Sequence, residues 1–395
     1  MGIADTAGAA ERQLSVDLLI VGGGIMGLWA AVHAERLGID ALLVDAGEPG
    51  QGASGGLLGA LMPHMPDRWS DKKQFQFDAL VSLENEIAAL EAATGLSAGY
   101  RRCGRLVPLP KPHLRKIAQR HSQDAEVNWH VGDRRYRWNV LDVPPLSGWI
   151  TPEAGEAGFV HDTLAARVSP RRYIAVLRAY LGSARHVRVA QNLAIGRIDP
   201  AAGLATCDNR SAIRFGHCIV AAGYRSFPLL DELTKPLAVS LGQPVKGQAA
   251  LLRAEVDPEL PVVFLDGLYI VPHEDGHVAI GSTSENSFAD GFSTDDKLDD
   301  LLAKSRALVP ALGGAAVVER WAGLRPKAID RDPMVGPHPD HPNLVALTGG
   351  FKVSFGLAHR LAEAAIAFVA ENRETPVLPA SFTLESHIAA ARRKG

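Results

Sequence analysis

Residues 16–45 read VDLLIVGGGIMGLWAAVHAERLGIDALLVD, and this stretch decides the fold of the first part of the chain. The apolar run 16–21 predicts a buried parallel strand, and the Ala-rich stretch that ends at Leu37 predicts a helix. Residues 41–44 predict a second strand, which ends at Asp45. Strand, helix and strand in this order predict a βαβ unit.

The turn between the first strand and the helix carries glycines at the spacing G-x-G-x-x-G, namely Gly22, Gly24 and Gly27. Glycines allow the backbone to approach a pyrophosphate, and the following helix N-terminus offers free N–H groups and the positive end of its dipole. An acid after the second strand, here Asp45, is placed to accept hydrogen bonds from a ribose. The stretch therefore predicts dinucleotide binding, and it leaves FAD and a nicotinamide cofactor both open.

Composition indicates an ordinary globular protein large enough for two domains. The chain has 395 residues, of which 47% are hydrophobic and 22% charged, and its net charge is −3. This charge provides no general attraction to nucleic acid or to an anionic membrane. No apolar run reaches the roughly 18 to 20 residues of a membrane helix, and residues 1–14 lack the features of a secretory signal. We therefore expect a cytoplasmic protein with a flexible tail at 1–14.

Cysteines and clustered arginines suggest no further site. Cys103, Cys207 and Cys218 are odd in number and lack metal-type spacing, which favours a reducing compartment and neither disulfides nor a metal site. Arginines gather at 101, 102 and 105 and again at 134, 135 and 137. We expect both groups to be solvated surface charge.

The chain returns more than once to the domain that it begins. A glycine-rich segment follows Asp45, and its small residues at 52–56 suit contact with phosphates or a flat ring, although a plain linker is an equal alternative. A helix is predicted at 73–94. Residues 96–150 predict strands and turns of a second domain. The expected fold is α/β (α+β), a Rossmann-type dinucleotide-binding domain with an inserted antiparallel β-sheet domain; the resemblance described next implies that the first is an FAD-binding domain and the second a substrate domain. The expected boundaries are 15–95, 151–238 and 322–372 for the first domain, 96–150 and 239–321 for the second, and 373–395 for a peripheral C-terminal tail.

Several motifs together resemble those of the FAD-dependent D-amino-acid oxidase superfamily, in its glycine oxidase and sarcosine oxidase branch. The resemblance runs from Val16 to about Ala370. The motifs that carry it are GGGIMG at 22–27, Asp45, GASGGLLGAL at 52–61, PVKGQ at 244–248, LYIVP at 268–272, GSTSE at 281–285, WAGLRP at 321–326 and GGFKVSFGLA at 349–358.

The resemblance implies FAD as the cofactor and a small amine or amino acid with a carboxylate as the substrate. It implies hydride transfer from the substrate to flavin and an imine that hydrolyses. Oxygen is the expected acceptor, with peroxide formed, and another electron acceptor stays open. Sarcosine oxidases attach flavin through a cysteine in the C-terminal third, and no cysteine follows Cys218 here, so we expect noncovalent FAD. The cofactor-binding residues implied are Gly22, Gly24, Ile25, Met26, Gly27, Asp45, Ala46, Ala53, Ser54, Gly55, Gly56, Leu58, Leu193, Ala222, Gly223, Arg325, Gly350, Phe351, Lys352 and Val353.

Three residues are the candidates for catalysis, namely Arg325, Tyr269 and Lys352. The planar fork of Arg325 suits a substrate carboxylate, with a surface pairing to Asp330 or Asp332 as the alternative. Tyr269 matches a substrate-contacting tyrosine of the family, with a core tyrosine as the alternative. Lys352 either binds the carboxylate or places positive charge near the flavin, and Lys352 or Lys246 is a candidate for promoting reaction with oxygen.

Two departures from the family pattern leave the substrate open. His273 stands where these proteins commonly have arginine, and Gly350 stands where glycine oxidase-like proteins often have histidine. Glycine, sarcosine, a larger N-substituted glycine and a D-amino acid all remain candidates. The alternatives in function are an FAD-dependent 2-hydroxy acid dehydrogenase and a tRNA-modifying flavin module. We expect no nucleic-acid partner and no membrane, and a homo-oligomer is left open.

Overall fold

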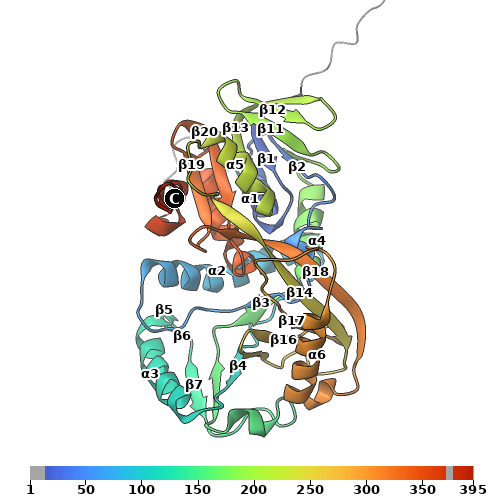
Figure 1. Cartoon of the computed structure of the whole chain (residues 1–395), viewed down its shortest axis with the longest axis vertical. Helices are drawn as coiled ribbons and strands as arrows, with labels where there is room; N and C mark the ends of the chain where they lie inside the picture. The colour runs from blue at the N-terminus through green and yellow to red at the C-terminus, as the bar shows by residue number, and fades with distance from the viewer. Residues whose placement is uncertain (1–13, 371–376, 395) are drawn as a thin grey trace, which may run out of the picture.

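The computed structural model describes residues 14–370 and 377–394, which form two bodies, each around one large sheet (Figure 1). The predicted tail at 1–14 lies outside the described residues except for Leu14, which begins the first strand. Within the described residues no helix is long and apolar enough to cross a membrane.

The first body is built on an eight-stranded sheet. Its strands are β1 (Leu14–Val21), β2 (Ala41–Val44), β10 (Val187–Ala190), β11 (Ile195–Asp199), β12 (Leu204–Cys207), β13 (Ala212–Val220), β19 (Met334–His338) and β20 (His341–Thr348). Parallel pairs join β10, β2, β1, β13 and β20 in that order. Strand β12 pairs antiparallel with the beginning of β13 and β20 pairs with its end, and β11 and β19 extend these two branches in antiparallel pairs. The predicted βαβ unit is therefore the centre of a Rossmann-type sheet.

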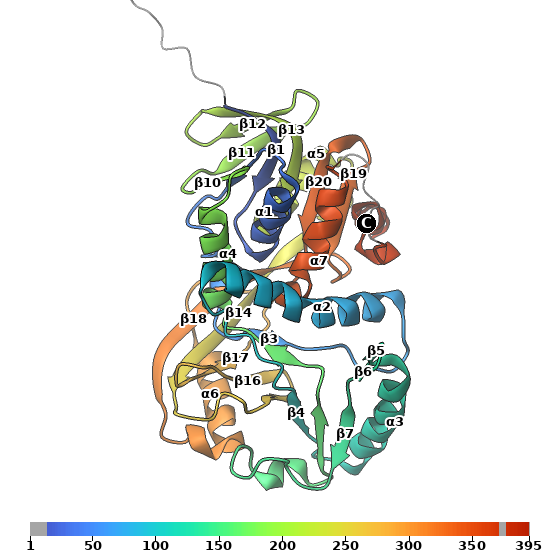
Figure 2. The same cartoon turned by 180° about the vertical axis from the view of Figure 1, so that it is seen from behind.

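Helices cover both faces of this sheet, which explains why its central strands are apolar on both sides. The helices are α1 (Ile25–Leu37), α2 (Asp71–Thr94), α4 (Pro170–Gly182), α5 (Ser226–Leu233), α7 (Ser354–Ala367) and α8 (Leu384–Arg393). Leu18 and Ile20 of β1 share a core with α1, α2, α4 and α7, while Leu19 and Val21 share one with α5 and α8. In Figure 2, α1 and α7 lie beside each other over the sheet, and α2 runs between the two bodies.

The second body is built on another eight-stranded sheet, with the order β18-β14-β17-β16-β15-β4-β8-β7. Its strands are β4 (Arg105–Pro108), β7 (Trp138–Leu141), β8 (Phe159–Asp162), β14 (Gly242–Arg253), β15 (Val262–Leu265), β16 (Leu268–Pro272), β17 (His277–Gly281) and β18 (Ala316–Ala328). All neighbours are antiparallel except β15 and β4. Helix α6 (Asp296–Leu308) packs on one face.

Short elements complete the described chain. Strand β3 (Ala60–Leu61) pairs with β9 (Ala166–Arg167), and β5 (His130–Val131) pairs with β6 (Arg134–Arg135). Single 3-10 turns are η1 (Ala53–Gly55), η2 (Pro152–Gly155), η3 (Gly223–Arg225), η4 (Pro310–Leu312) and η5 (Ala380–Phe382).

The two longest strands join the bodies. Strands β14 and β18 pair antiparallel along twelve registered positions, from Gly242 with Ala328 to Arg253 with Ala316. At one end Leu241 and Ala328 are buried in a core of the first body, and at the other Leu252 is buried in the core of the second. A continuous two-stranded ribbon therefore runs from one body into the other (Figure 1).

The structure differs from the sequence-based expectation in three places. Residues 112–128 form helix α3 (Pro112–Asn128) instead of strands; it buries only Ala118 and Ala125, so its sequence has no apolar stripe to reveal a helix. Strand β8, expected in the first domain, pairs with β4 and β7 of the second sheet. Helix α8, expected in a peripheral tail, buries Leu384 and Ile388 against the first body.

Candidate functional site

A cavity of about 1070 Å³ runs along the junction of the two bodies and brings together most of the residues predicted to form the site. Its walls come from β1, α1, the glycine-rich segment 46–65, residues 221–225 after β13, the second sheet and the loop before α7. The predicted residues that line it are Gly22, Gly24, Ile25, Met26, Asp45, Ala46, Ala53, Ser54, Gly56, Leu58, Leu193, Ala222, Gly223, Tyr269, Arg325, Phe351, Lys352 and Val353.

The glycine turn at one end of the cavity packs so closely against neighbouring backbone carbonyls that two of its glycines leave no room for a side chain. Gly22 has φ of +105°, and a Cβ on it would lie 2.5 Å from the Ala221 carbonyl oxygen. A Cβ on Gly27 would lie 1.8 Å from the Gly22 carbonyl oxygen. Gly27 does not line the cavity among the described residues; it permits close packing of the turn behind the wall. These glycines leave an open backbone cradle at the start of α1.

The N-terminus of α1 is available to an anion. Its N-cap is Gly24, which provides no side-chain hydrogen bond, and its first turn contains no acid. The hydroxyl of Ser54 accepts a hydrogen bond from the Ile25 N–H at 2.9 Å, so the segment 52–56 lies against this helix end. Free N–H groups and the helix dipole favour negative charge there.

Asp45 lies at the carboxyl end of β2, as the βαβ motif requires. Its Oδ2 accepts a hydrogen bond from the Gly23 N–H at 2.6 Å, and its Oδ1 accepts one from the Gly47 N–H at 2.8 Å. Each carboxylate oxygen can accept a second hydrogen bond, which a ribose hydroxyl would donate. The cradle, the open helix end and this acid together fit the adenosine and phosphate end of a dinucleotide such as FAD.

The opposite end of the cavity is formed by one face of the second sheet. Directly paired residues of neighbouring strands share a face. One such row crosses five strands, and its members are Phe264, Tyr269, Gly281, Ala249 and Trp321. Arg325 lies four residues beyond Trp321 on β18 and so belongs to the same face. This face packs against the segment that contains Leu57 and Met62.

Arg325 presents a guanidinium to the cavity without an ion-pair contact, although the charge of Glu285 acts on it from a greater distance. Its Nη1 and Nη2 donate to the Thr283 carbonyl at 3.2 and 3.3 Å, and no carboxylate of the described residues lies within ion-pair distance. The alternative partners are taken, since Asp330 pairs with Lys394 and Asp332 with Lys72. Burial lowers the pKa of Arg325 to about 10, so it stays charged at neutral pH.

Gly247 explains how Arg325 reaches this position. Arg325 pairs with Val245 of β14, and Gly247 lies two residues further along that strand. A Cβ on Gly247 would lie 1.8 Å from Nη2 of Arg325. The glycine of the PVKGQ motif therefore leaves the space that the guanidinium fills. This gives a physical reason for the glycine that the motif alone did not reveal.

Tyr269 stands between aromatic and charged neighbours. Its ring lies 4.9 Å from that of Phe264, centroid to centroid, at an interplanar angle of 49°. Burial raises the pKa of Tyr269, and the charges of Arg105 and then Arg325 oppose this shift. The hydroxyl is therefore protonated at neutral pH and is able to donate a hydrogen bond within the cavity.

The loop before α7 closes the cavity beside Arg325. The Phe351 N–H donates to the Pro326 carbonyl at 3.2 Å, and Phe351 has φ of 44°, a left-handed conformation. The Lys352 ammonium lies 5.6 Å from the centre of the Phe351 ring. Partial loss of water lowers the pKa of Lys352, and the charges of Arg325 and Arg331 add to this effect. The N-terminus of α7 follows without a side-chain cap, so positive potential gathers here.

Gly350 and Gly55 lie behind the wall and do not line the cavity. A Cβ on Gly350 would lie 2.3 Å from Cε of Met26 and 2.5 Å from Oγ of Ser354. A side chain at this position would require movement of the Met26 and Ser354 side chains. Gly55 packs in the same way against the Gly50 carbonyl.

Two further residues named from the sequence lie elsewhere. Lys246 is buried and pairs with Asp295 at 3.4 Å, and its strand position puts it on the opposite face from Arg325. His273, which was expected to bear on substrate choice, is buried outside the cavity lining and bonds to the Leu57 carbonyl at 3.0 Å. Burial lowers the pKa of His273 to about 4, so it is neutral and structural.

Sequence reasoning missed several residues that line the cavity, including Arg105, Phe264, His64, Phe292 and Leu324. Arg105 is the most consequential, because it was grouped with surface arginines and is in fact 2% exposed. The signal available was its place at the start of the apolar run RLVP, which forms β4. Arginine is almost never fully buried unless it is paired, and the partner here is Asp162 on the neighbouring strand β8, 57 residues away in the sequence.

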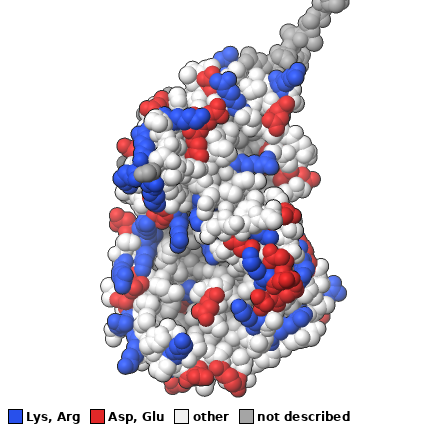
Figure 3. All heavy atoms as spheres, in the orientation of Figure 1, with Lys and Arg blue, Asp and Glu red and all other residues white. Residues whose placement is uncertain are grey.

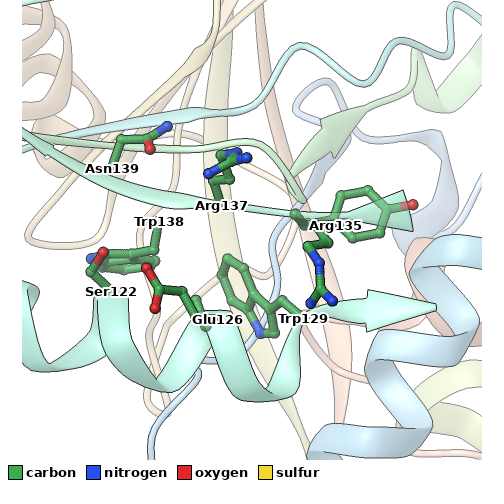
Figure 4. Close-up of a pocket in the computed structure, with 9 residues that line it drawn as sticks. Ser122, Glu126, Trp129, Arg135, Arg137, Trp138 and Asn139 are labelled. Carbon is green, nitrogen blue, oxygen red and sulfur yellow. The ribbon is translucent and has the colours of Figure 1, made fainter. Parts of the chain in front are cut away.

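A second, smaller cavity of about 320 Å³ lies between α3 and β7 (Figure 4). Trp129 and Trp138 line it, with ring centroids 5.9 Å apart. Trp138 also lies under Arg105, whose Cζ is 5.3 Å from the indole centre. Trp138, which lines the small cavity, and Arg105, which lines the large one, therefore lie between the two cavities. On the outside, acidic and basic side chains are interspersed over the face in Figure 3, in agreement with the net charge of −3.

Comparison with known proteins gives consistent matches along the chain. The profile of the family described as FAD dependent oxidoreductase (DAO) matches residues 17–364. A glycine oxidase of Pseudomonas aeruginosa is 30% identical over 355 residues, which cover 87% of this chain and 92% of the relative. The crystal structure of glycine oxidase from Geobacillus kaustophilus superposes with a TM-score of 0.83 at 22% identity, covering 94% of this chain and 99% of that one. That of iminodiacetate oxidase from Chelativorans sp. BNC1 gives 0.79 at 22% identity, covering 93% and 98%.

Proposed function

This chain belongs to the FAD dependent oxidoreductase (DAO) family, and from that premise we propose that it oxidises the C–N bond of a small amino acid or an N-substituted glycine. Its cofactor is noncovalent FAD, which agrees with the backbone cradle and open helix end of the cavity. The products of the reaction would be an imine, which water hydrolyses, and the reduced cofactor, which oxygen reoxidises with formation of peroxide.

The observation that carries the proposal is Arg325. Its guanidinium lines the cavity, bonds only to a backbone carbonyl, and lies beyond ion-pair distance of the acids in the described residues. A buried charge without a counter-charge is costly, and a bound carboxylate would remove that cost with two parallel hydrogen bonds. A substrate that carries its reacting nitrogen next to a carboxylate is therefore the best fit to this end of the cavity.

The residues around Arg325 give the substrate one orientation. The FAD cofactor, when bound, supplies the acceptor for the hydride of the substrate α-carbon. Arg325 holds the carboxylate, which fixes the position of the α C–H relative to the loop before α7. Tyr269 donates a hydrogen bond from the same face, and Phe264 and Trp321 exclude water beside it. Lys352 and the N-terminus of α7 stabilise negative charge that develops near them.

A substrate panel tests the proposal. Glycine, sarcosine, D-alanine, glycolate and D-lactate are mixed anaerobically with the purified FAD-loaded protein, and bleaching of the flavin absorbance is followed. We expect bleaching by at least one amine and by neither hydroxy acid. Bleaching by the hydroxy acids alone would replace this proposal with 2-hydroxy acid oxidation, which the same anchor would serve.

Admission of air tests the acceptor separately. We expect the flavin absorbance to return and peroxide to appear in an amount equal to the amine consumed. A flavin that stays reduced in air would assign another electron acceptor and leave the amine chemistry intact.

A further inference from the structure

Arg105 is a second cation of the cavity that the proposed chemistry does not use. It lies at the start of β4, is 2% exposed and lines the cavity. Its Nε donates to Oδ2 of Asp162 at 2.5 Å. Neither terminal nitrogen has a hydrogen-bond partner among the described residues: Nη2 is fully buried, whereas Nη1 is not and is the nitrogen left to a ligand in the cavity. A buried guanidinium that makes a hydrogen bond with only one of its nitrogens still has N–H groups without an acceptor, and this costs free energy.

Its partner Asp162 does not complete the fork, because Oδ2 of Asp162 is bonded to Nε of Arg105 alone. Oδ1 of Asp162 already accepts hydrogen bonds from the Leu164 and Ala165 N–H groups at 3.2 and 2.8 Å. Arg105 is also held from below, because its Cζ lies 5.3 Å from the indole centre of Trp138. The guanidinium is therefore fixed in place on two sides, and a bidentate acceptor would have to come from the cavity.

Arg105 and Arg325 occupy the same face of the second sheet. Arg105 pairs with Val262 of β15, two residues before Phe264, so it shares the face on which Phe264, Tyr269 and Arg325 lie. Tyr269 lies between the two arginines in strand order, and the charge of each acts on its hydroxyl. Both arginines therefore line the same cavity, with the aromatic rings of Tyr269 and Phe264 on the strands between them.

We propose that Arg105 binds a second carboxylate of the substrate and so makes this enzyme selective for amino dicarboxylates. The inference rests on the proposed function, since Arg325 is taken to hold the carboxylate next to the reacting carbon. The second carboxylate belongs either to the substituent on nitrogen, as in N-carboxymethylglycine, or to the side chain of an α-amino acid. Arg105 is a specificity-determining residue and takes no part in hydride transfer.

The first experiment compares two-carboxylate with one-carboxylate substrates by steady-state kinetics of the FAD-loaded protein. Iminodiacetate represents a second carboxylate on nitrogen, D-glutamate and D-aspartate represent one on the side chain, and sarcosine and D-alanine are their one-carboxylate counterparts. We expect kcat/KM to be at least about tenfold higher for a two-carboxylate member of one pair, mainly through KM. A ratio near one in both pairs would overturn the proposal.

Variants then assign the preference to Arg105. Arg105→Gln should reduce the ratio of the two kcat/KM values by about tenfold or more, whereas Arg320→Gln, an exposed arginine of β18, should leave it unchanged. If Arg105→Gln fails to fold because Asp162 is left unpaired, Arg105→Gln combined with Asp162→Asn removes both charges together. An unchanged ratio in a folded Arg105 variant would overturn the proposal.

A binding measurement separates this proposal from the proposed function. Acetate, malonate, succinate, glutarate and adipate are titrated into the protein, and the shift of the flavin absorbance or of the unfolding temperature is recorded. We expect one dicarboxylate length to bind at least about tenfold more tightly than acetate, with that preference lost in Arg105→Gln. If no amine is oxidised, the proposed function fails and this titration still decides the role of Arg105; equal affinities across the series would contradict it.

Discussion

The two ends of the large cavity differ in the chemical groups that form them: mainly backbone at one end and mainly side chains at the other. The end formed by β1 and α1 uses glycines, backbone N–H groups and one acid at a strand end. The end formed by the second sheet uses long side chains, chiefly Arg325, Tyr269 and Arg105, on strands that are far apart in sequence. A site made of backbone depends on a local run of residues, whereas a site made of side chains depends on the register between strands. The predictions below test how separable these ends are.

The largest effect is expected from Gly27→Ala, because the new Cβ would lie 1.8 Å from the Gly22 carbonyl oxygen and must displace backbone. We expect the FAD content of the purified protein to fall by more than about tenfold, as measured by the ratio of flavin to protein absorbance. Gly182→Ala at the end of α4, where a Cβ meets no atom within 4 Å, is the matched control and should retain FAD. Normal FAD content in Gly27→Ala would show that the turn tolerates a side chain.

Arg325→Ala should lower activity and not FAD content, since it removes a side chain at the other end of the cavity and leaves the glycine turn intact. We expect kcat/KM to fall by the equivalent of about 2 to 5 kcal/mol, while FAD content stays near that of the unmodified protein. Arg320→Ala, on the same strand and paired with the exposed Asp299, is the control. Loss of FAD together with activity would show that the two ends are not separable at this residue.

His273 connects the two ends, because it follows β16 of the second sheet and bonds to the Leu57 carbonyl beside the glycine-rich segment. Its pKa is about 4 in the folded chain and 6.5 ordinarily, so between these values the unfolded chain binds the additional proton. Stability should therefore fall as pH falls from about 6.5 to 4, by on the order of 3 kcal/mol at most from this residue.

Urea unfolding at a series of pH values measures this dependence. In His273→Gln the fall in stability over that pH range should be smaller than in the unmodified protein. His113→Gln, at an exposed position of α3, is the control and should leave the pH dependence unchanged. Identical curves for all three proteins would contradict the assignment to His273.

The smallest effect is expected from Tyr269→Phe, which removes one hydroxyl and keeps the ring that packs on Phe264. A single hydrogen bond contributes about 0.5 to 1.5 kcal/mol, so kcat/KM should fall by roughly three- to tenfold. Folding stability and FAD content should not change. A fall comparable to that of Arg325→Ala would mean that the tyrosine holds the substrate as strongly as the arginine does.

The same contrast explains what could be predicted from the sequence. The βαβ unit, its glycine turn and the position of Asp45 at the end of β2 were predicted correctly, because each follows from neighbours within 30 residues of the chain. Arg105 was misplaced because its burial depends on the pairing of β4 with β15, more than 150 residues away. Helix α3 was missed because it has almost no buried apolar side chain to give it a period. Arg325 and Tyr269 were proposed from a family resemblance. That they share one face of the second sheet depends on the register of five strands, which the sequence does not show.

The ribbon of β14 and β18 has a consequence for how such enzymes can diversify. Since this pair is buried in the cores of both bodies, neither body is an exchangeable module that recombination could replace as a unit. A cut at either end would sever strands of a sheet and leave their hydrogen-bonding groups unpaired. A change of substrate preference that keeps this ribbon intact is therefore open to single side chains of the cavity lining, such as those on the cavity face of the second sheet, beneath an unchanged cofactor cradle.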